Sequence, residues 1–142
     1  NLENKEIEPQ NRKTMEYHIS KTVTGNFDEI ISKVKDELKK EGFGVLTEID
    51  IKTTLKNKLD VDFRKYTILG ACNPGYAHSA LLAEDKVGTM LPCNVIVQEI
   101  GEGKVEVAAV NPKASMMASK NTQLEQLASD VTKKLKNVVA GI

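Results

Sequence analysis

One long apolar stripe near the C-terminus limits what this chain can fold into. The apolar residues recur at helical spacing, and they are Leu124, Leu127, Ala128, Val131, Leu135, Val138 and Val139. Full burial of such side chains contributes roughly 1.5–3 kcal/mol each, so a helix here must pack against a broad apolar surface. Thr122 and Glu125 have the spacing of a capping box, which predicts that the helix starts at this point.

The upstream sequence predicts a sheet that can supply this surface. Alternating apolar residues predict strands near 17–23, 43–50 and 63–72, a fourth that carries Val95 and Val97, and a fifth at 105–109. Helical spacing predicts a helix that opens at Asn26 and ends at Gly42, a short helix capped by Asp50, and a third helix near 75–84 with Asn73 as its N-cap. A hairpin turn at Gly101-Glu102-Gly103 makes at least part of the sheet antiparallel.

These elements predict an α+β fold with the order β-α-β-α-β-α-β-β-α. We expect a single, mainly antiparallel sheet of about five strands, with the first and last helices packed on one face. Its 142 residues are the usual length of one domain. Residues 1–14 are polar and lack periodicity, so we expect a poorly ordered tail before a single α+β domain at 15–142.

Composition excludes several functions. Lys and Arg number 20, as do Asp and Glu, so a nucleic-acid partner is not expected. No apolar run approaches the roughly 20 residues that cross a bilayer, so a membrane partner is not expected either. With two cysteines and no secretory h-region, we expect a cytoplasmic protein with reduced thiols. The compartment would be extracytoplasmic if residues 1–14 follow a removed leader.

The familiar catalytic patterns are absent, so the sequence predicts no cofactor. It has no P-loop, no His-Glu-x-x-His, no Gly-x-Ser-x-Gly and no Cys-x-x-Cys. What remains is a pair of similar motifs at strand ends. Leu69-Gly70-Ala71-Cys72-Asn73-Pro74 closes one strand, and Leu91-Pro92-Cys93-Asn94-Val95 opens the next.

With these motifs, the chain resembles the bacterial "domain of unknown function 302" family. The resemblance also covers Glu41 to Asp50 and the segment from Lys58-Leu59 to Phe63, and it extends from Met15 onward. It implies a compact α+β domain and a dimer, and it implies no settled activity. The sequence itself adds an expected edge strand that a second subunit could complete, so we expect a homodimer.

The two cysteines admit two hypotheses. Cys72 precedes a predicted helix N-terminus, where partial positive charge favours a thiolate, so Cys72 could be a catalytic thiol with Cys93 as its resolving partner. Alternatively, both are small buried hydrophobic residues. If the two strands are antiparallel neighbours, Cys72 and Cys93 lie at the same end of the sheet and can share a cleft.

Three polar residues near the motifs are candidate ligand-binding residues. They are Asn73, Asn94 and His78, although Asn at strand ends commonly serves turns and caps. His78 could join both cysteines in a soft-metal site, but a lone His on a short helix is typical of a surface residue, so no metal site is expected. Three functions stay open: a module that binds a small ligand or a partner, a thiol-dependent enzyme or redox protein, and a structural homodimer without a pocket.

Overall fold

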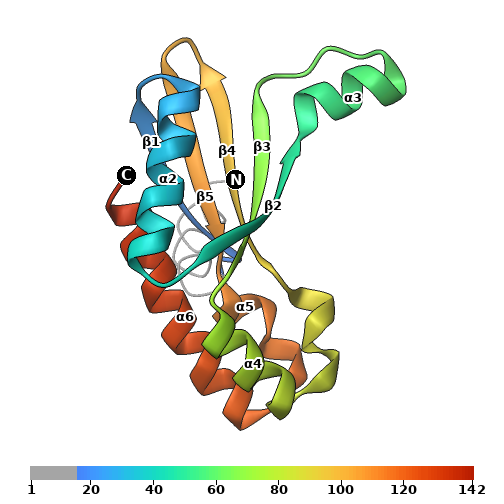
Figure 1. The fold of residues 1–142 in the computed structure, drawn as a ribbon, viewed down its shortest axis with the longest axis vertical. Helices are drawn as coiled ribbons and strands as arrows, with labels where there is room; N and C mark the ends of the chain where they lie inside the picture. Colours follow the sequence, from blue (N-terminus) through green and yellow to red (C-terminus); the bar gives the residue numbers. More distant parts are fainter. Residues whose placement is uncertain (1–15) are drawn as a thin grey trace, which may run out of the picture.

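The computed structural model describes residues 16–142, so the predicted tail at 1–14 lies outside the described residues. Five antiparallel strands form one sheet with the order β1-β5-β4-β3-β2 (Figure 1). The strands are β1 (His18–Thr24), β2 (Gly44–Asp50), β3 (Tyr66–Cys72), β4 (Cys93–Gly101) and β5 (Lys104–Val110). The predicted α+β class is confirmed, and the sheet is antiparallel throughout.

The helices follow the predicted order, with short additions before β4 and after β5. The four predicted helices are α2 (Phe27–Lys40), α3 (Ile51–Leu59), α4 (Pro74–Ala83) and α6 (Thr122–Ala140). The additions are the 3-10 helices η1 (Asp85–Met90) and η2 (Met117–Ser119) and the single turn α5 (Pro112–Ser115). The sequence pattern predicts only connecting segments in both of these regions.

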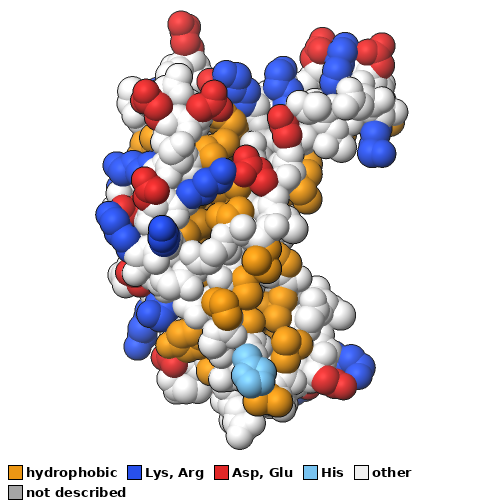
Figure 2. Space-filling model, viewed as in Figure 1, with side chains coloured by type: hydrophobic (Ala, Val, Ile, Leu, Met, Phe, Trp, Pro, Cys, Tyr) orange, Lys and Arg blue, Asp and Glu red, His pale blue; other side chains and the backbone are white. Residues whose placement is uncertain are grey.

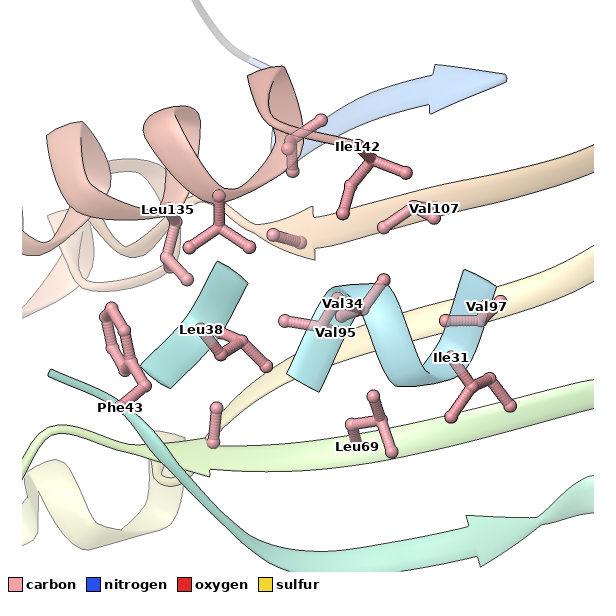
Figure 3. Close-up of a cluster of buried hydrophobic side chains, with 14 of the residues drawn as sticks. Ile31, Val34, Leu38, Phe43, Leu69, Val95, Val97, Val107, Leu135 and Ile142 are labelled. Atoms are coloured by element: carbon pink, nitrogen blue, oxygen red, sulfur yellow. The ribbon is translucent and has the colours of Figure 1, made fainter. Parts of the chain in front are cut away.

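The main core lies between the sheet and two helices on one of its faces. Helices α2 and α6 both contribute to it, as predicted, and β3, β4 and β5 supply the facing side chains (Figure 3). Its most deeply buried members are Val34, Leu38, Leu69, Val95, Val97, Val105, Val107, Leu135 and Val138. Burial of this many branched side chains makes the main core the chief source of stability.

Strand β1 forms one edge of the sheet, and a charged residue interrupts its core-facing row. Lys21 lies between Ile19 and Val23 on that row. Its Nζ donates to the carbonyl oxygens of Ala140 at 3.2 Å and Ile142 at 3.4 Å, at the C-terminal end of α6. A cation is stabilised there by unpaired carbonyl groups and by the helix dipole.

Asparagine begins both of the long helices. The Asn26 side chain accepts from the Glu29 amide at 3.1 Å, which confirms the predicted start of α2. The predicted capping box of α6 is wrong, because its N-cap is Asn121 and Thr122 is already helical. The Asn121 Oδ1 accepts from the Leu124 amide at 3.1 Å. Asn and Thr are both good N-caps, so spacing alone did not separate the two positions.

Helix α3 stands apart from the main core, beyond the ends of β2 and β3 (Figure 1). It has no buried residue, and its start is fixed by Asp50, whose Oδ1 accepts from the Thr53 amide at 3.0 Å. These hydrogen bonds to Thr53 lower the pKa of Asp50. The predicted cap is confirmed.

A second, smaller cluster lies at the opposite end of the sheet from α3. It joins α4, η1, α5 and the first half of α6, and we call it the end cluster. Its buried members are Ala80, Val87, Met116, Leu124 and Ala128.

In the described part of the chain, no helix is long and apolar enough to span a membrane.

Candidate functional site

The two Cys-Asn motifs meet at the end of the sheet beside the end cluster. Cys72 is the last residue of β3 and Cys93 is the first residue of β4. The strands are antiparallel neighbours, with Ala71 paired to Cys93. The structure therefore has the same-end arrangement, one of the two that the sequence left open.

Both cysteines line a cavity of about 310 Å³ between the main core and the end cluster. Strand ends form one side of it, α4 forms the roof, and the first half of α6 forms the floor. The lining residues are Phe43, Leu46, Ala71, Cys72, Asn73, Tyr76, Ala77, Ala80, Leu81, Leu91, Pro92, Cys93, Pro112, Met116, Leu124, Leu127, Ala128 and Val131. Within the described part of the chain, the lining has no ionisable group other than the two thiols and the Tyr76 phenol.

Beside this cavity, two side chains lie very close to the backbone of Gly70 in β3. A Cβ atom on Gly70 would overlap Thr47 Oγ1 and would lie 2.9 Å from Pro92 Cγ, so only glycine fits between these neighbours. The register of β2 against β3 shifts between Val45 and Thr47. Leu46 lies at this bulge and lines the cavity although its side chain is 67% exposed, so the mouth is on this side.

The two thiols have different surroundings. Cys93 is buried, and this burial raises the pKa of its thiol to about 11, with a smaller contribution from the neighbouring Cys72. Cys72 is only half-buried. A resolving thiol must ionise to react, so the surroundings of Cys93 suit a lining side chain better than a resolving partner.

Asn73 is the N-cap residue of α4, but its side chain does not cap the helix. Its Nδ2 instead donates to the Glu41 carbonyl oxygen at 3.2 Å, in the turn between α2 and β2. Gly42, in the left-handed region with a φ of 86°, brings this turn close, since a Cβ there would lie 3.1 Å from Asn73 Nδ2. Asn73 therefore anchors the start of α4 to the main body of the domain.

The other two candidate ligand-binding residues do not line the cavity. Asn94 is exposed and lies in a groove on the opposite face of the sheet, with Tyr66 and Ile96. Side chains alternate along β4, so Asn94 and Cys93 face opposite ways. His78 is exposed on α4 and is not among the lining residues. Among residues 16–142, no three His, Cys, Asp or Glu side chains lie close enough to hold a metal ion.

Sequence reasoning missed most of the lining, because it searched for polar and reactive residues. One usable signal was the sequence of α4 (Pro74–Ala83). In the structure Ala80 is its one buried residue, although the helix is apolar on nearly every side. Such a helix is usually buried all round. Figure 2 shows apolar side chains gathered over the α4 end of the molecule, in contrast to the charged surface of α2.

Comparison with known proteins places the chain in a family. The sequence profile of "Domain of unknown function DUF302" matches residues 19–142. The chain belongs to this family. No curated protein matches the sequence.

A solved DUF302 structure has the same fold. It is the crystal structure of an uncharacterized conserved DUF302 protein from Bacillus stearothermophilus, which is 28% identical. The TM-score is 0.82, over 89% of this chain and 98% of that one. The DUF302 family assignment thus agrees with the sequence resemblance and describes a fold whose function is unknown.

Proposed function

We propose that this DUF302 protein binds a small apolar ligand in the cavity between the main core and the end cluster. The observation that carries the proposal is a cavity of about 310 Å³, open to the surface on the Leu46 side, with an almost wholly apolar lining. Protein interiors are close-packed, with few voids larger than a water molecule. A space of this size falls at the lower end of the range for small-molecule sites, roughly 300–1,000 Å³.

Binding of a neutral apolar probe tests this proposal. Titration with 1-decanol, followed by calorimetry and by amide chemical shifts, should give saturable binding with shifts at α4 and at the start of β4. Ala77→Leu places a larger side chain in the cavity and should weaken binding at least tenfold. Ala83→Leu, the same change on the same helix at a residue outside the lining, is the matched control. Equal affinity of the two variants would show that the probe binds elsewhere.

We also propose that two copies associate through the sheet face opposite α2 and α6. A row of directly paired residues crosses this face, with Ile49 beside Ile68 and Ile68 beside Ile96. Ile68 and Ile96 are half-buried, and Ile49 is 44% exposed. An apolar row on a sheet face that neither α2 nor α6 covers is typical of a protein contact.

Sedimentation at micromolar concentration tests the homodimer. Ile96→Lys should shift the mass from a dimer to one chain of 15.6 kDa, because it places a charge in the middle of the row. Leu82→Lys, at an exposed leucine of α4, should leave the dimer intact. A single species of 15.6 kDa in the unmodified protein would contradict the homodimer.

A further inference from the structure

A lysine continues the row of α6 residues that lines the cavity. Leu124, Leu127 and Val131 follow one another along α6, and Lys134 is the next position on that row. The Lys134 Nζ lies 5.9 Å from the centroid of the Tyr76 ring, and Tyr76 itself lines the cavity. Lys134 is half-buried and is not itself a lining residue, so its positive charge lies next to Tyr76, beside the cavity rather than inside it.

The nearby acidic side chains have other partners. Asp130, one helical turn before Lys134, accepts from Gln126 Nε2 at 3.2 Å. Glu41, from the turn between α2 and β2, accepts from Asn137 Nδ2 at 3.3 Å. Among residues 16–142, Lys134 makes no ion pair. Hydrogen bonds from amides leave both carboxylates charged, but neither carboxylate pairs directly with Lys134, so the ammonium group can still pair with an anionic ligand.

The start of α4 lies at the same end and adds to the positive potential. Tyr76 belongs to the first turn of α4, so its contact with Lys134 brings the two features together. The Asn73 side chain does not cap this turn, and no other side chain among residues 16–142 accepts a hydrogen bond from its first amide groups. These amides carry the partial positive charge of the helix N-terminus and reinforce the charge of Lys134.

We infer that the ligand is a medium-chain carboxylate, whose apolar chain fills the cavity and whose carboxylate lies beside Lys134. This inference rests on the proposed function. The cavity is about twice the size of an engineered 150 Å³ cavity that holds benzene, so it has room for a chain with more carbon atoms than benzene. A carboxylate buried within the apolar lining would be costly, so it must lie at the charged end.

Three probes with the same chain and different head groups test the inference. They are decanoate, 1-decanol and decylammonium, titrated at neutral pH below their aggregation concentrations. Decanoate should bind about fivefold more tightly than 1-decanol, the effect of one partly exposed ion pair. Decylammonium should bind more weakly than 1-decanol. Added salt should weaken the binding of decanoate and leave that of 1-decanol nearly unchanged.

Variants of α6 identify which lysine is responsible for the preference for decanoate. Lys134→Gln should remove the preference for decanoate while keeping the affinity for 1-decanol. Lys133→Gln removes the neighbouring exposed charge from the same helix and should keep the preference. Melting curves of both variants should match that of the unmodified protein, because neither change alters a fully buried side chain.

The outcomes separate the two proposals. Equal affinity for decanoate and 1-decanol, or tightest binding of decylammonium, would overturn the carboxylate inference and leave the apolar cavity as a ligand site. A decanoate preference that survives Lys134→Gln would also overturn it. If none of the three probes binds, the cavity proposal fails, and the carboxylate inference is overturned with it.

Discussion

The main core and the end cluster use the same kinds of side chain in different ways. In the main core, α2 and α6 press branched side chains against the sheet, and the side chains between them are almost completely buried. In the end cluster, α4 roofs a cavity of about 310 Å³ and contributes Ala80 as its one buried residue. A side chain that borders a void has no partner atoms on that side and gains less dispersion energy. The difference shows that this chain concentrates stability in one region and leaves room for a ligand in the other.

The largest expected effect comes from the same truncation made in each region. Leu135→Ala in the main core should lower the free energy of unfolding by about 2–5 kcal/mol, because it removes a large apolar side chain and opens a cavity in its place. Leu124→Ala in the end cluster should cost less, since Leu124 already borders the cavity. Urea denaturation measures both. A cost at Leu124 equal to or above that at Leu135 would break the comparison.

Enlarging an alanine should lower the stability of the protein in the main core but not beside the cavity. Ala109→Leu adds volume to the close-packed main core and should destabilise the protein by about 1–3 kcal/mol. Ala80→Leu adds the same atoms beside the cavity and should be neutral or stabilising by roughly 0.5–2 kcal/mol. Thermal melting of the two variants measures both changes in stability. A similar loss at both sites would mean that the cavity does not accept added volume.

High pH should reveal the buried thiol at the boundary between the two regions. Burial raises the pKa of Cys93 from 9.0 to about 11, so the unfolded chain ionises first and stability falls as pH rises through this interval. Relative to Cys93→Ala, the unmodified protein should lose on the order of 2 kcal/mol between about pH 8 and 10.5. Parallel pH profiles would contradict this. The same burial predicts that iodoacetamide modifies Cys72 before Cys93.

The smallest expected effect concerns the attachment of α4. Asn121 Oδ1 caps α6, and its Nδ2 donates to the Ala83 carbonyl oxygen at 2.9 Å, at the end of α4. Asn121→Asp keeps the cap and removes this donor, so it should cost about 0.5–1.5 kcal/mol. Asn121→Ala loses both bonds and should cost more. Hydrogen exchange should show faster opening of α4 in both variants, and unchanged exchange there would contradict its weak attachment.

Periodicity predicted most of the fold because burial on one side imposes it. The α6 stripe and the alternation in β5 located these elements to within a residue or two. The end cluster was harder, because η1 and α5 are too short to show a period. The N-cap of α6 was placed one residue late, at Thr122 instead of Asn121, since both residues favour the N-cap.

The candidate site was only partly predictable. The Cys-Asn motifs led to the end of the sheet that borders the cavity, because Cys72 and Cys93 lie at ends of antiparallel strands. Asn94 was grouped with Cys93 on sequence proximity, although alternation along β4 turns it to the other face. Leu46 and Tyr76 come from distant segments whose convergence depends on tertiary packing. An apolar cavity leaves little trace in a sequence, because its lining residues resemble those of any core.

The hydrogen bonds from Lys21 to Ala140 and Ile142 join the two ends of the described domain, across 119 and 121 positions of sequence. On a ribosome, β1 emerges before the rest of the sheet, and α6 emerges after it. Until α6 is complete, the sheet has only α2 to shield its apolar face, and the segment that becomes the cavity floor is missing. Native packing therefore has to wait until α6 has been synthesised, and contacts between such distant positions slow folding. During this interval the nascent chain exposes apolar surface that favours aggregation.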